Sequence, residues 1–554
     1  MLKSALKRTL CLIILLFATF SLQACDFFKD EEVTYKDTVN IDMAVIWNGL
    51  SSIYPSTGSN NPTAEVIRQK TGVNVEFTFY DGFENDNLTR LFTVGKNMPE
   101  VIMAPYWGGG DACSAAIRQA VEDGFLIPVD EYLDTIAPNL KDSWTNGVSK
   151  SFQENELTHK AFNGKKYIIP MQTPAAHEDF SNWCYDVFCR KDILEALNVD
   201  PGSIHTSEDI YELAKKIKAG SFKDINGNDI IICSTFANGY SYECYLNSFK
   251  SRRAMTNVIQ KDDGSLDWIC NSPKLEEEIK FMNKMINEGL FDKSAFSHNQ
   301  DTVTQKMING SVAMTACRYA QVDMLLSNTL YKTNPEMEYV PLGPIYDANG
   351  EAAMPDSYRE NSGEYGFPVI LITRDCKNVE AFMRYLNYIN SDEGERICIL
   401  GVEGEDWEYN KKGEIVRTAK WEEEIAKNPN YDIERGTKYL YIGISQVHQH
   451  LYDTASSRNN PWYDRLKEMY PVYFSQGTFA SSFDEEFEEI EYFRNILGAM
   501  NYQTTIESAY CAKDETKALA ILSTYRKNLA KNGYLERYLA WLTERLKGID
   551  DVLF

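Results

Sequence analysis

The most constraining feature of the chain is an alternation of strand and helix patterns between residues 39 and 104. Apolar residues alternate over 39–45 and over 73–79, and an unbroken apolar run fills 101–104. A helix pattern begins at Asn61-Pro62, where Asn suits the cap and Pro the first turn, and ends before Gly72. A second helix is predicted near 88–94. Strands joined by short helical crossovers form a parallel sheet, so the sequence predicts an α/β fold.

Aromatic and polar residues follow two of these predicted strands. Ligands of such sheets bind beyond the carboxyl ends of the strands. We therefore expect ligand contacts from Trp47, Asn48, Tyr106, Trp107 and Asp111. For Trp47 and Trp107, packing at the edge of the core stays open as an alternative.

Residues 1–24 predict a signal peptide. Basic residues precede an apolar run over 10–20, which is shorter than a membrane-spanning helix. Leu22-Gln23-Ala24-Cys25 resembles the lipobox of bacterial lipoproteins, which implies that Cys25 becomes the lipidated N-terminus. An ordinary signal peptide with a chance cysteine is the alternative. Residues 25–37 then form a tether, and the lipid would be the only membrane attachment.

The charge balance limits the partners. The chain has 56 Lys+Arg against 81 Asp+Glu, a formal net charge of −25. Binding to nucleic acid requires basic residues that replace counterions, so no nucleic-acid partner is expected.

The cysteine pattern speaks against structural zinc. Of 12 cysteines, Cys11 would be lost with the signal peptide and Cys25 lipidated, and the rest are scattered from Cys113 to Cys511 without a C-x-x-C pair. Disulfides and free thiols both remain open. No metal and no cofactor are expected.

Eight segments, in order along residues 40–410, carry a family resemblance. The most specific are 388–394 and 400–407; the others are 64–75, 95–102, 122–133, 163–170, 190–194 and 309–314. Together they resemble the extracellular solute-binding proteins of bacterial ABC importers, the family that includes maltose-binding protein. Residues 410–554 match only loosely, as a helical extension.

The resemblance implies two α/β lobes of the periplasmic-binding type II fold, joined by a hinge and closing on a ligand. Lobe 1 would comprise 38–160 and 340–395, and lobe 2 would comprise 161–339 and 396–554. The chain would cross between lobes near 155–165, 335–345 and 390–405.

The resemblance also implies ligand-binding residues on the second lobe. These are Trp183, Tyr185, Tyr240, Tyr242, Arg318 and Tyr319, with Trp407 near the hinge. Flat aromatic rings cover the C–H faces of a sugar, and Asp, Asn and Arg bind its hydroxyls. About half of the aromatic candidates are expected to be core residues instead.

The function so implied is capture without chemistry. A monomeric, lipid-anchored, extracytoplasmic receptor would bind an oligosaccharide or similar polar solute and deliver it to the permease subunits of an ABC transporter. The alternatives are a secreted glycoside hydrolase, which needs two carboxylates flanking the scissile bond, and a solute receptor for a sensor kinase.

Two weaker signals favour structural interpretations. Asp224–Asp229 has oxygen-bearing residues at alternate positions, as in a calcium-binding EF-hand loop, but its Gly is misplaced and position 12 is Thr235. A polar turn is expected there. His448 and His450 have no third ligand nearby and are expected to be a surface pair.

Overall fold

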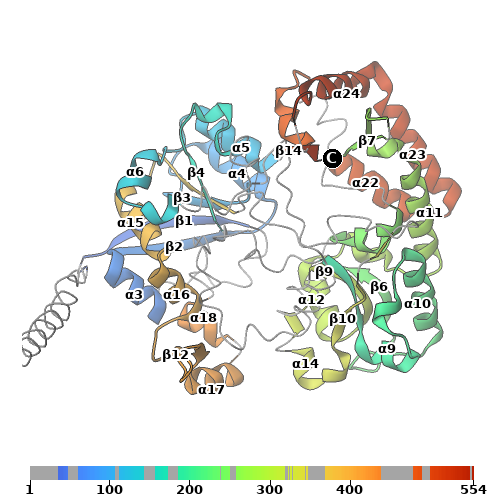
Figure 1. Cartoon of the computed structure of the whole chain (residues 1–554), viewed down its shortest axis with the longest axis horizontal. Coiled ribbons are helices and arrows are strands. Elements are labelled where there is room, and N and C mark those ends of the chain that lie inside the picture. Colours follow the sequence, from blue (N-terminus) through green and yellow to red (C-terminus); the bar gives the residue numbers. More distant parts are fainter. Residues whose placement is uncertain are drawn as a thin grey trace, which may run out of the picture.

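The computed structural model describes most of the chain after the tether. The described residues are 35, 37–47, 60–106, 112–141, 156–171, 185–236, 239–249, 257–261, 263–318, 322, 325–326, 329–343, 345–346, 368–428, 430–437, 478–489, 499–549 and 552–553. Cys25, His448 and His450 lie outside them. Two lobes, each with its own sheet and core, lie side by side (Figure 1).

The first lobe contains a five-stranded sheet in the order β2-β1-β3-β11-β4. β1 (Val39–Ile46) pairs in parallel with β2 (Val73–Tyr80) and β3 (Val101–Ala104). β11 (Val369–Ile372) runs antiparallel between β3 and β4 (Ile168–Pro170). The predicted parallel α/β start is therefore confirmed.

Helices cover the two faces of this sheet. In α3 (Pro62–Thr71) the Asn61 side chain caps Ala64 N–H and Gly72 ends the helix at φ 68°, as its sequence predicts. α4 (Glu84–Val94) begins four residues before the predicted segment, because its first turn is polar. The remaining helices are α5 (Ala112–Glu122), α6 (Asp130–Thr135), α7 (Pro138–Lys141), α15 (Val379–Ile389) and α16 (Asp392–Leu400).

The second lobe contains a four-stranded sheet in the order β10-β5-β9-β6. Its strands are β5 (Tyr185–Arg190), β6 (Ile231–Thr235), β9 (Val312–Arg318) and β10 (Tyr339–Pro341). A hairpin of β7 (Val258–Gln260) and β8 (Leu266–Trp268) lies outside this sheet. The helices are α9 (Lys191–Leu197), α10 (Ser207–Ala219), α11 (Pro273–Asn287), α12 (Gln300–Ile308) and α14 (Leu330–Thr333), with a 3-10 helix η7 (Tyr242–Phe249).

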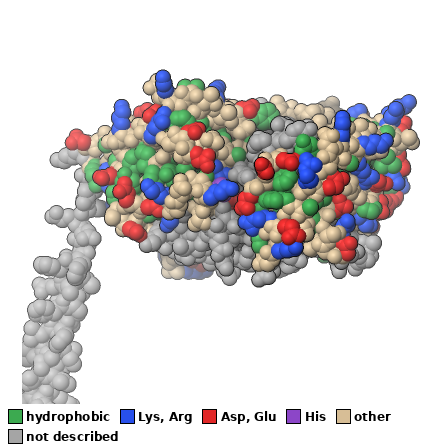
Figure 2. All heavy atoms as spheres, turned by 90° about the horizontal axis from the view of Figure 1, so that it is seen from above, with side chains coloured by type: hydrophobic (Ala, Val, Ile, Leu, Met, Phe, Trp, Pro, Cys, Tyr) green, Lys and Arg blue, Asp and Glu red, His purple; other side chains and the backbone are tan. Residues whose placement is uncertain are grey.

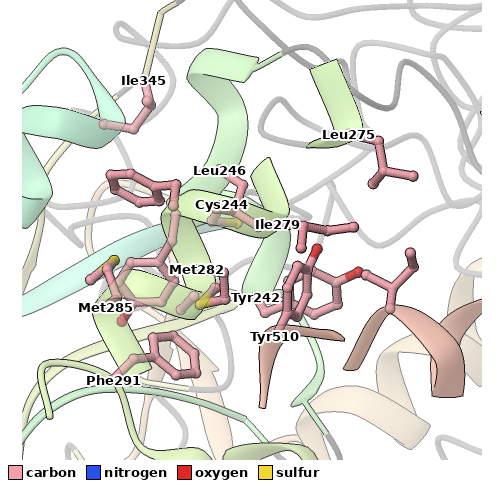
Figure 3. Close-up of a cluster of buried hydrophobic side chains, with 14 of the residues drawn as sticks. Tyr242, Cys244, Leu246, Leu275, Ile279, Met282, Met285, Phe291, Ile345 and Tyr510 are labelled. Atoms are coloured by element: carbon pink, nitrogen blue, oxygen red, sulfur yellow. The ribbon is translucent and has the colours of Figure 1, made fainter. Parts of the chain in front are cut away.

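The C-terminal helices belong to the second lobe. α22 (Ala499–Tyr510), α23 (Glu515–Leu529) and α24 (Tyr534–Arg545) share one core with η7 and α11, part of which is drawn in Figure 3. Asn283 on α11 donates to the carbonyls of Tyr510 (3.0 Å) and Ala512 (2.8 Å), which lie at the end of α22. A short parallel pair, β14 (Thr478–Phe479) and β15 (Val552–Leu553), completes the extension.

The lobe boundaries implied by the resemblance need two corrections. β4 pairs with β11, so the first lobe runs to Met171 rather than 160. β10 and Ile345 belong to the second core, so residues 340–346 are not part of lobe 1. The first two crossings therefore fall between 171 and 185 and between 346 and 368. A strand of three residues carries too little sequence pattern to predict which sheet it joins.

A third correction concerns residues 396–437, which lie against the first lobe (Figure 1). They form β12 (Trp407–Tyr409), β13 (Ile415–Arg417), α17 (Ala419–Lys427) and α18 (Tyr431–Arg435). Ile399 packs against the first core and against the small cluster around Trp407. A Cβ on Gly436 would lie 1.9 Å from Asn61 Oδ1, so only glycine allows this close approach to the cap of α3. The third crossing therefore falls between 437 and 478.

None of the described cysteines is joined to another in a disulfide. Eight of the nine are buried, and only Cys511 is partly exposed; Cys184 lies outside the described residues. Burial raises the pKa of Cys270 to about 12 and that of Cys376 to about 11. Among the described residues, none forms a helix long and apolar enough to span a membrane.

We expect the nine described cysteines to remain reduced, because none is joined to another in a disulfide and eight of them are buried in the cores. Dithiothreitol should shift Tm by less than about 1 °C, since no cross-link is lost. Iodoacetamide should label the eight buried thiols only in denaturant, with mass spectrometry of the intact chain and its peptides as readout. A mass lower by the two hydrogens of a disulfide would contradict this.

Candidate functional site

The carboxyl ends of the parallel strands of the first sheet lie at one edge. Ile46 is in register with Tyr80, and Val45 with Met103, so the residues that follow β1, β2 and β3 lie near one another. Trp47 is half-buried at this edge and packs against the first core. Of the sequence candidates here, Asn48, Trp107 and Asp111 lie outside the described residues.

Tyr106 follows β3 at the same edge, but its ring lies in the core. It is fully buried, and its hydroxyl lies 3.1 Å from Glu156 Oε2 and 3.2 Å from Arg118 Nη1. Arg118 Nη1 also donates to Glu156 Oε2 at 3.1 Å. Burial and the Glu156 carboxylate raise the pKa of Tyr106. The prediction that Tyr106 stacks on a ligand is corrected, because the ring has no free face.

Arg118 and Glu156 are site-supporting residues that the sequence did not reveal. Both side chains are at most 5% exposed, and they join α5 to the chain end of β3 and to the segment before β4. A buried ion pair of this kind fixes local geometry because each charge requires its partner. The apolar pattern of α5 gives no signal for it, since Arg118 occupies a position on the helix face turned to the core.

A matching edge exists on the second sheet. β6 and β9 run parallel, with Thr235 opposite Ala316, so their carboxyl ends coincide. β5 runs antiparallel to β9, with Tyr185 opposite Arg318, so the start of β5 lies at this edge as well. The backbones of Tyr185 and Arg318 therefore meet where the sequence predicted ligand contacts. Trp183 and Tyr319 lie outside the described residues.

The turn after β6 presents Tyr240 to solvent. The Tyr240 side chain is 46% exposed. Gly239 (φ 79°) and Ser241 (φ 71°) flank it in the left-handed region, which is strained for a serine. Such strain in a loop at a strand end is found often at ligand sites. The residue types around Ser241 do not predict it.

Tyr242, two residues further, points into the second core. It is 5% exposed and makes edge contacts with Phe296 (5.7 Å between ring centroids) and Tyr510 (5.5 Å), as Figure 3 shows for Tyr510. Its predicted ligand contact is corrected for the same reason as that of Tyr106.

Trp407 is an anchor of the segment beside the first lobe. Its ring is 2% exposed, packs with Leu400 and Ile415, and donates from Nε1 to Gly401 O at 3.0 Å. The neighbouring Asp406 carboxylate accepts from Val402 N–H at 2.8 Å and from Arg435 at 2.9 Å. The predicted ligand contact of Trp407 is corrected to a structural role.

Two buried carboxylates near these edges are bound within the protein. Glu156 pairs with Arg118, and the buried Asp186 accepts from Val187 N–H (2.6 Å) and Gly343 N–H (3.0 Å). A hydrolase needs two carboxylates turned toward a substrate. Within the described part of the chain, no group of three or more His, Cys, Asp or Glu side chains is arranged to hold a metal ion.

The comparisons with known proteins identify the class. The model of the bacterial extracellular solute-binding protein family matches residues 57–396, more than half of the chain. The chain therefore belongs to this family, and the two-lobed fold implied by the resemblance is confirmed.

Among curated proteins, the chain is 23% identical over 265 residues to the fructooligosaccharide ABC transporter substrate-binding protein FusA of Streptococcus pneumoniae serotype 4 (strain ATCC BAA-334 / TIGR4). The match spans about half of each protein, 46% of this chain and 46% of FusA. Sequence similarity to FusA is thus partial.

Solved structures share the fold over nearly the whole chain. The alginate-binding protein AlgQ2, solved without calcium ion, has TM-score 0.63 and 18% identity, covering 93% of this chain and 99% of its own. The S. pneumoniae FusA complex with kestose has TM-score 0.61 and 18% identity, covering 92% and 98%. The S. pneumoniae N-glycan transport protein NgtS, solved with Man1GlcNAc, has TM-score 0.54 and 13% identity, covering 91% and 98%.

Arg118→Met should destabilise the protein by about 3–5 kcal/mol, because it leaves the Glu156 carboxylate buried without its partner. Arg68→Met is the control, since its partner Glu65 is 53% exposed and such pairs contribute about 0–1 kcal/mol. Urea unfolding gives both values. The double variant Arg118→Met/Glu156→Met should lose less unfolding free energy than Arg118→Met alone, because no charge is left without its partner. Equal losses of unfolding free energy in Arg118→Met and Arg68→Met would refute a structural role of the buried pair.

Proposed function

We propose that this chain captures an oligosaccharide outside the cytoplasmic membrane by closure of its two lobes and delivers it unchanged to an ABC permease. The lipid on Cys25 would hold it at the membrane, and it would act as a monomer. The observation that carries the proposal is the pair of sheet edges, each of which ends in an aromatic residue that keeps part of its surface accessible: Trp47 on the first lobe and Tyr240 on the second.

The chemistry of these edges suits a sugar. Aromatic faces stack on C–H groups, and hydroxyls need directed hydrogen bonds from polar groups nearby. The predicted contacts outside the described side chains are of both kinds; they are Asn48, Trp107, Asp111, Trp183, Arg318 and Tyr319. A ligand that binds both edges favours the closed state by its higher affinity for that state.

Family membership and the neighbours' ligands support the same class of solute. The names of FusA and NgtS refer to a fructooligosaccharide and to N-glycans, and both are substrate-binding proteins. Capture without hydrolysis agrees with Glu156 and Asp186, the buried carboxylates near the two edges, being bound within the protein. A receptor that reports to a sensor kinase would use the same site.

The charged surface suits an extracytoplasmic role without polyanion partners. On the face drawn in Figure 2, Lys and Arg side chains are interspersed with Asp and Glu, and the described residues of that face form no broad basic area. With a net charge of −25, attraction to nucleic acid is disfavoured.

A panel of oligosaccharides should contain at least one that raises Tm and is recovered intact. A ligand at about 100 times its Kd stabilises by about 2.7 kcal/mol, which thermal shift detects. Kestose, nystose, Man5GlcNAc, maltotriose and an alginate trimer make a suitable panel, with chromatography of the sugar after incubation. Cleavage of the bound sugar would refute capture and support a hydrolase.

Trp47→Ala and Tyr240→Ala should each weaken binding of that sugar about tenfold, or about 1.4 kcal/mol, because each removes one stacking face. Isothermal titration calorimetry gives Kd. Tyr409→Ala is the matched control, since Tyr409 is 49% exposed but lies on β12, away from both edges. Unchanged affinity in both site variants would place the ligand elsewhere.

A further inference from the structure

The turn Asp224–Asp229, before β6, is held by hydrogen bonds within the protein. Asp224 Oδ1 accepts from the N–H groups of Asn226 (2.9 Å) and Asn228 (2.8 Å). Oδ2 accepts from Asn228 Nδ2 (3.2 Å) and Ser311 Oγ (3.1 Å). A carboxylate offers about four lone-pair positions, so all of them are engaged.

The other residues of this turn do not complete a calcium site. Calcium takes six to eight oxygen ligands, usually with several carboxylates. Asp229, the only other acid in the turn, lies 2.5 Å from the Lys223 ammonium. Thr235, at the twelfth position, is buried in β6 and donates to Phe236 O at 2.9 Å. The donor set therefore fits a closed polar turn and not a divalent cation.

A permanent cation lies directly beneath this turn. The guanidinium of Arg190, at the end of β5, is 1% exposed. Its Nη1 donates to Lys223 O (2.9 Å) and to Gly310 O (2.7 Å). Its Nε and Nη2 donate to the two oxygens of Asp192, at 3.0 and 2.6 Å.

Arg190 thereby joins three parts of the second lobe. These are the turn through Lys223, the residues before β9 through Gly310, and the start of α9 through Asp192. Ile225 N–H donates to Asn309 O at 3.1 Å and closes the same junction. A guanidinium bound to carbonyls and a carboxylate does here what a bound metal ion does elsewhere: it gathers oxygen atoms around one positive charge.

We infer that the second lobe needs no divalent cation at this turn, because the Arg190 guanidinium supplies the positive charge that holds it to the sheet. The stability of the lobe, and binding at its edge, are then independent of calcium. This inference does not rest on which solute the protein captures.

The first test compares the full chain in EGTA and in millimolar calcium. Tm should differ by less than about 1 °C, whereas an ion at about 100 times its Kd would raise Tm by several degrees. Calorimetric titration of the unmodified protein with calcium chloride should show no 1:1 binding at this turn. The same titration of Asp224→Asn tells whether any binding that is seen depends on the turn. Binding that disappears in this variant would overturn the inference; binding that survives lies away from the turn and agrees with it.

The second test removes the positive charge of Arg190. Arg190→Met should lower Tm by at least about 5 °C, since it leaves the partly exposed Asp192 carboxylate and two carbonyls, those of Lys223 and Gly310, without their donor. Arg537→Met is the matched control: Arg537 also binds a carboxylate with two nitrogens and donates to a carbonyl, Asn532 O, but is 46% exposed. Equal losses in the two variants would overturn the role of Arg190.

If Arg190→Met does not fold, Arg190→Lys keeps the charge and removes the fork of donors. Hydrogen exchange at 223–229 and 309–311 should then rise at least about tenfold, with β1 and β2 of the first lobe unchanged. Unchanged exchange at both segments would overturn the inference.

Discussion

The structure depends on one constraint: each sheet buries its own faces, and the two cores have no residue in common. Each lobe can then stay rigid while the distance between the lobes changes, because closure repacks neither core. Along the described residues the chain changes lobe three times, between 171 and 185, 346 and 368, and 437 and 478. Since closure does not disturb a core, its free energy can be small enough for a solute bound to both edges to shift it.

The sequence allowed the parallel part of the first sheet to be predicted, because β1, β2 and β3 are eight, eight and four residues of regular apolar pattern with helix caps between them. It did not allow the lobe boundaries to be predicted, because β4 and β10 have three residues each and find their partners through contacts far along the chain. The assignment of residues 396–437 failed for a related reason. Those residues contact the first lobe at isolated points, such as Gly436 against Asn61. Isolated contacts produce no periodic pattern in the sequence.

The candidate site stays a prediction; the structure decides only which of its described residues are buried. Strand ends identify an edge, and the register of Tyr185 with Arg318 brings predicted residues together. Residue type does not say which aromatic ring faces solvent. Tyr240 and Tyr242 are the same residue two positions apart, yet one is 46% and the other 5% exposed, because the left-handed Ser241 between them redirects the backbone. The buried partners of Tyr106 were also hidden, since an arginine on a helix normally lies on its solvent side.

The second lobe shows what replaces covalent and metal cross-links in this chain. Within the described residues its sheet has four strands, two of which have five residues or fewer, and its described cysteines are not joined to one another by disulfides. The C-terminal helices enlarge its core, and polar contacts fix them to it: Asn283 binds the end of α22, and buried Glu278 accepts a hydrogen bond from the Tyr510 hydroxyl. On the other face of the sheet, Arg190 likewise joins separate segments of the lobe through polar contacts. Because these links are internal to the polypeptide, we expect the rigidity of the second lobe not to vary with the redox state or the ion content of its surroundings.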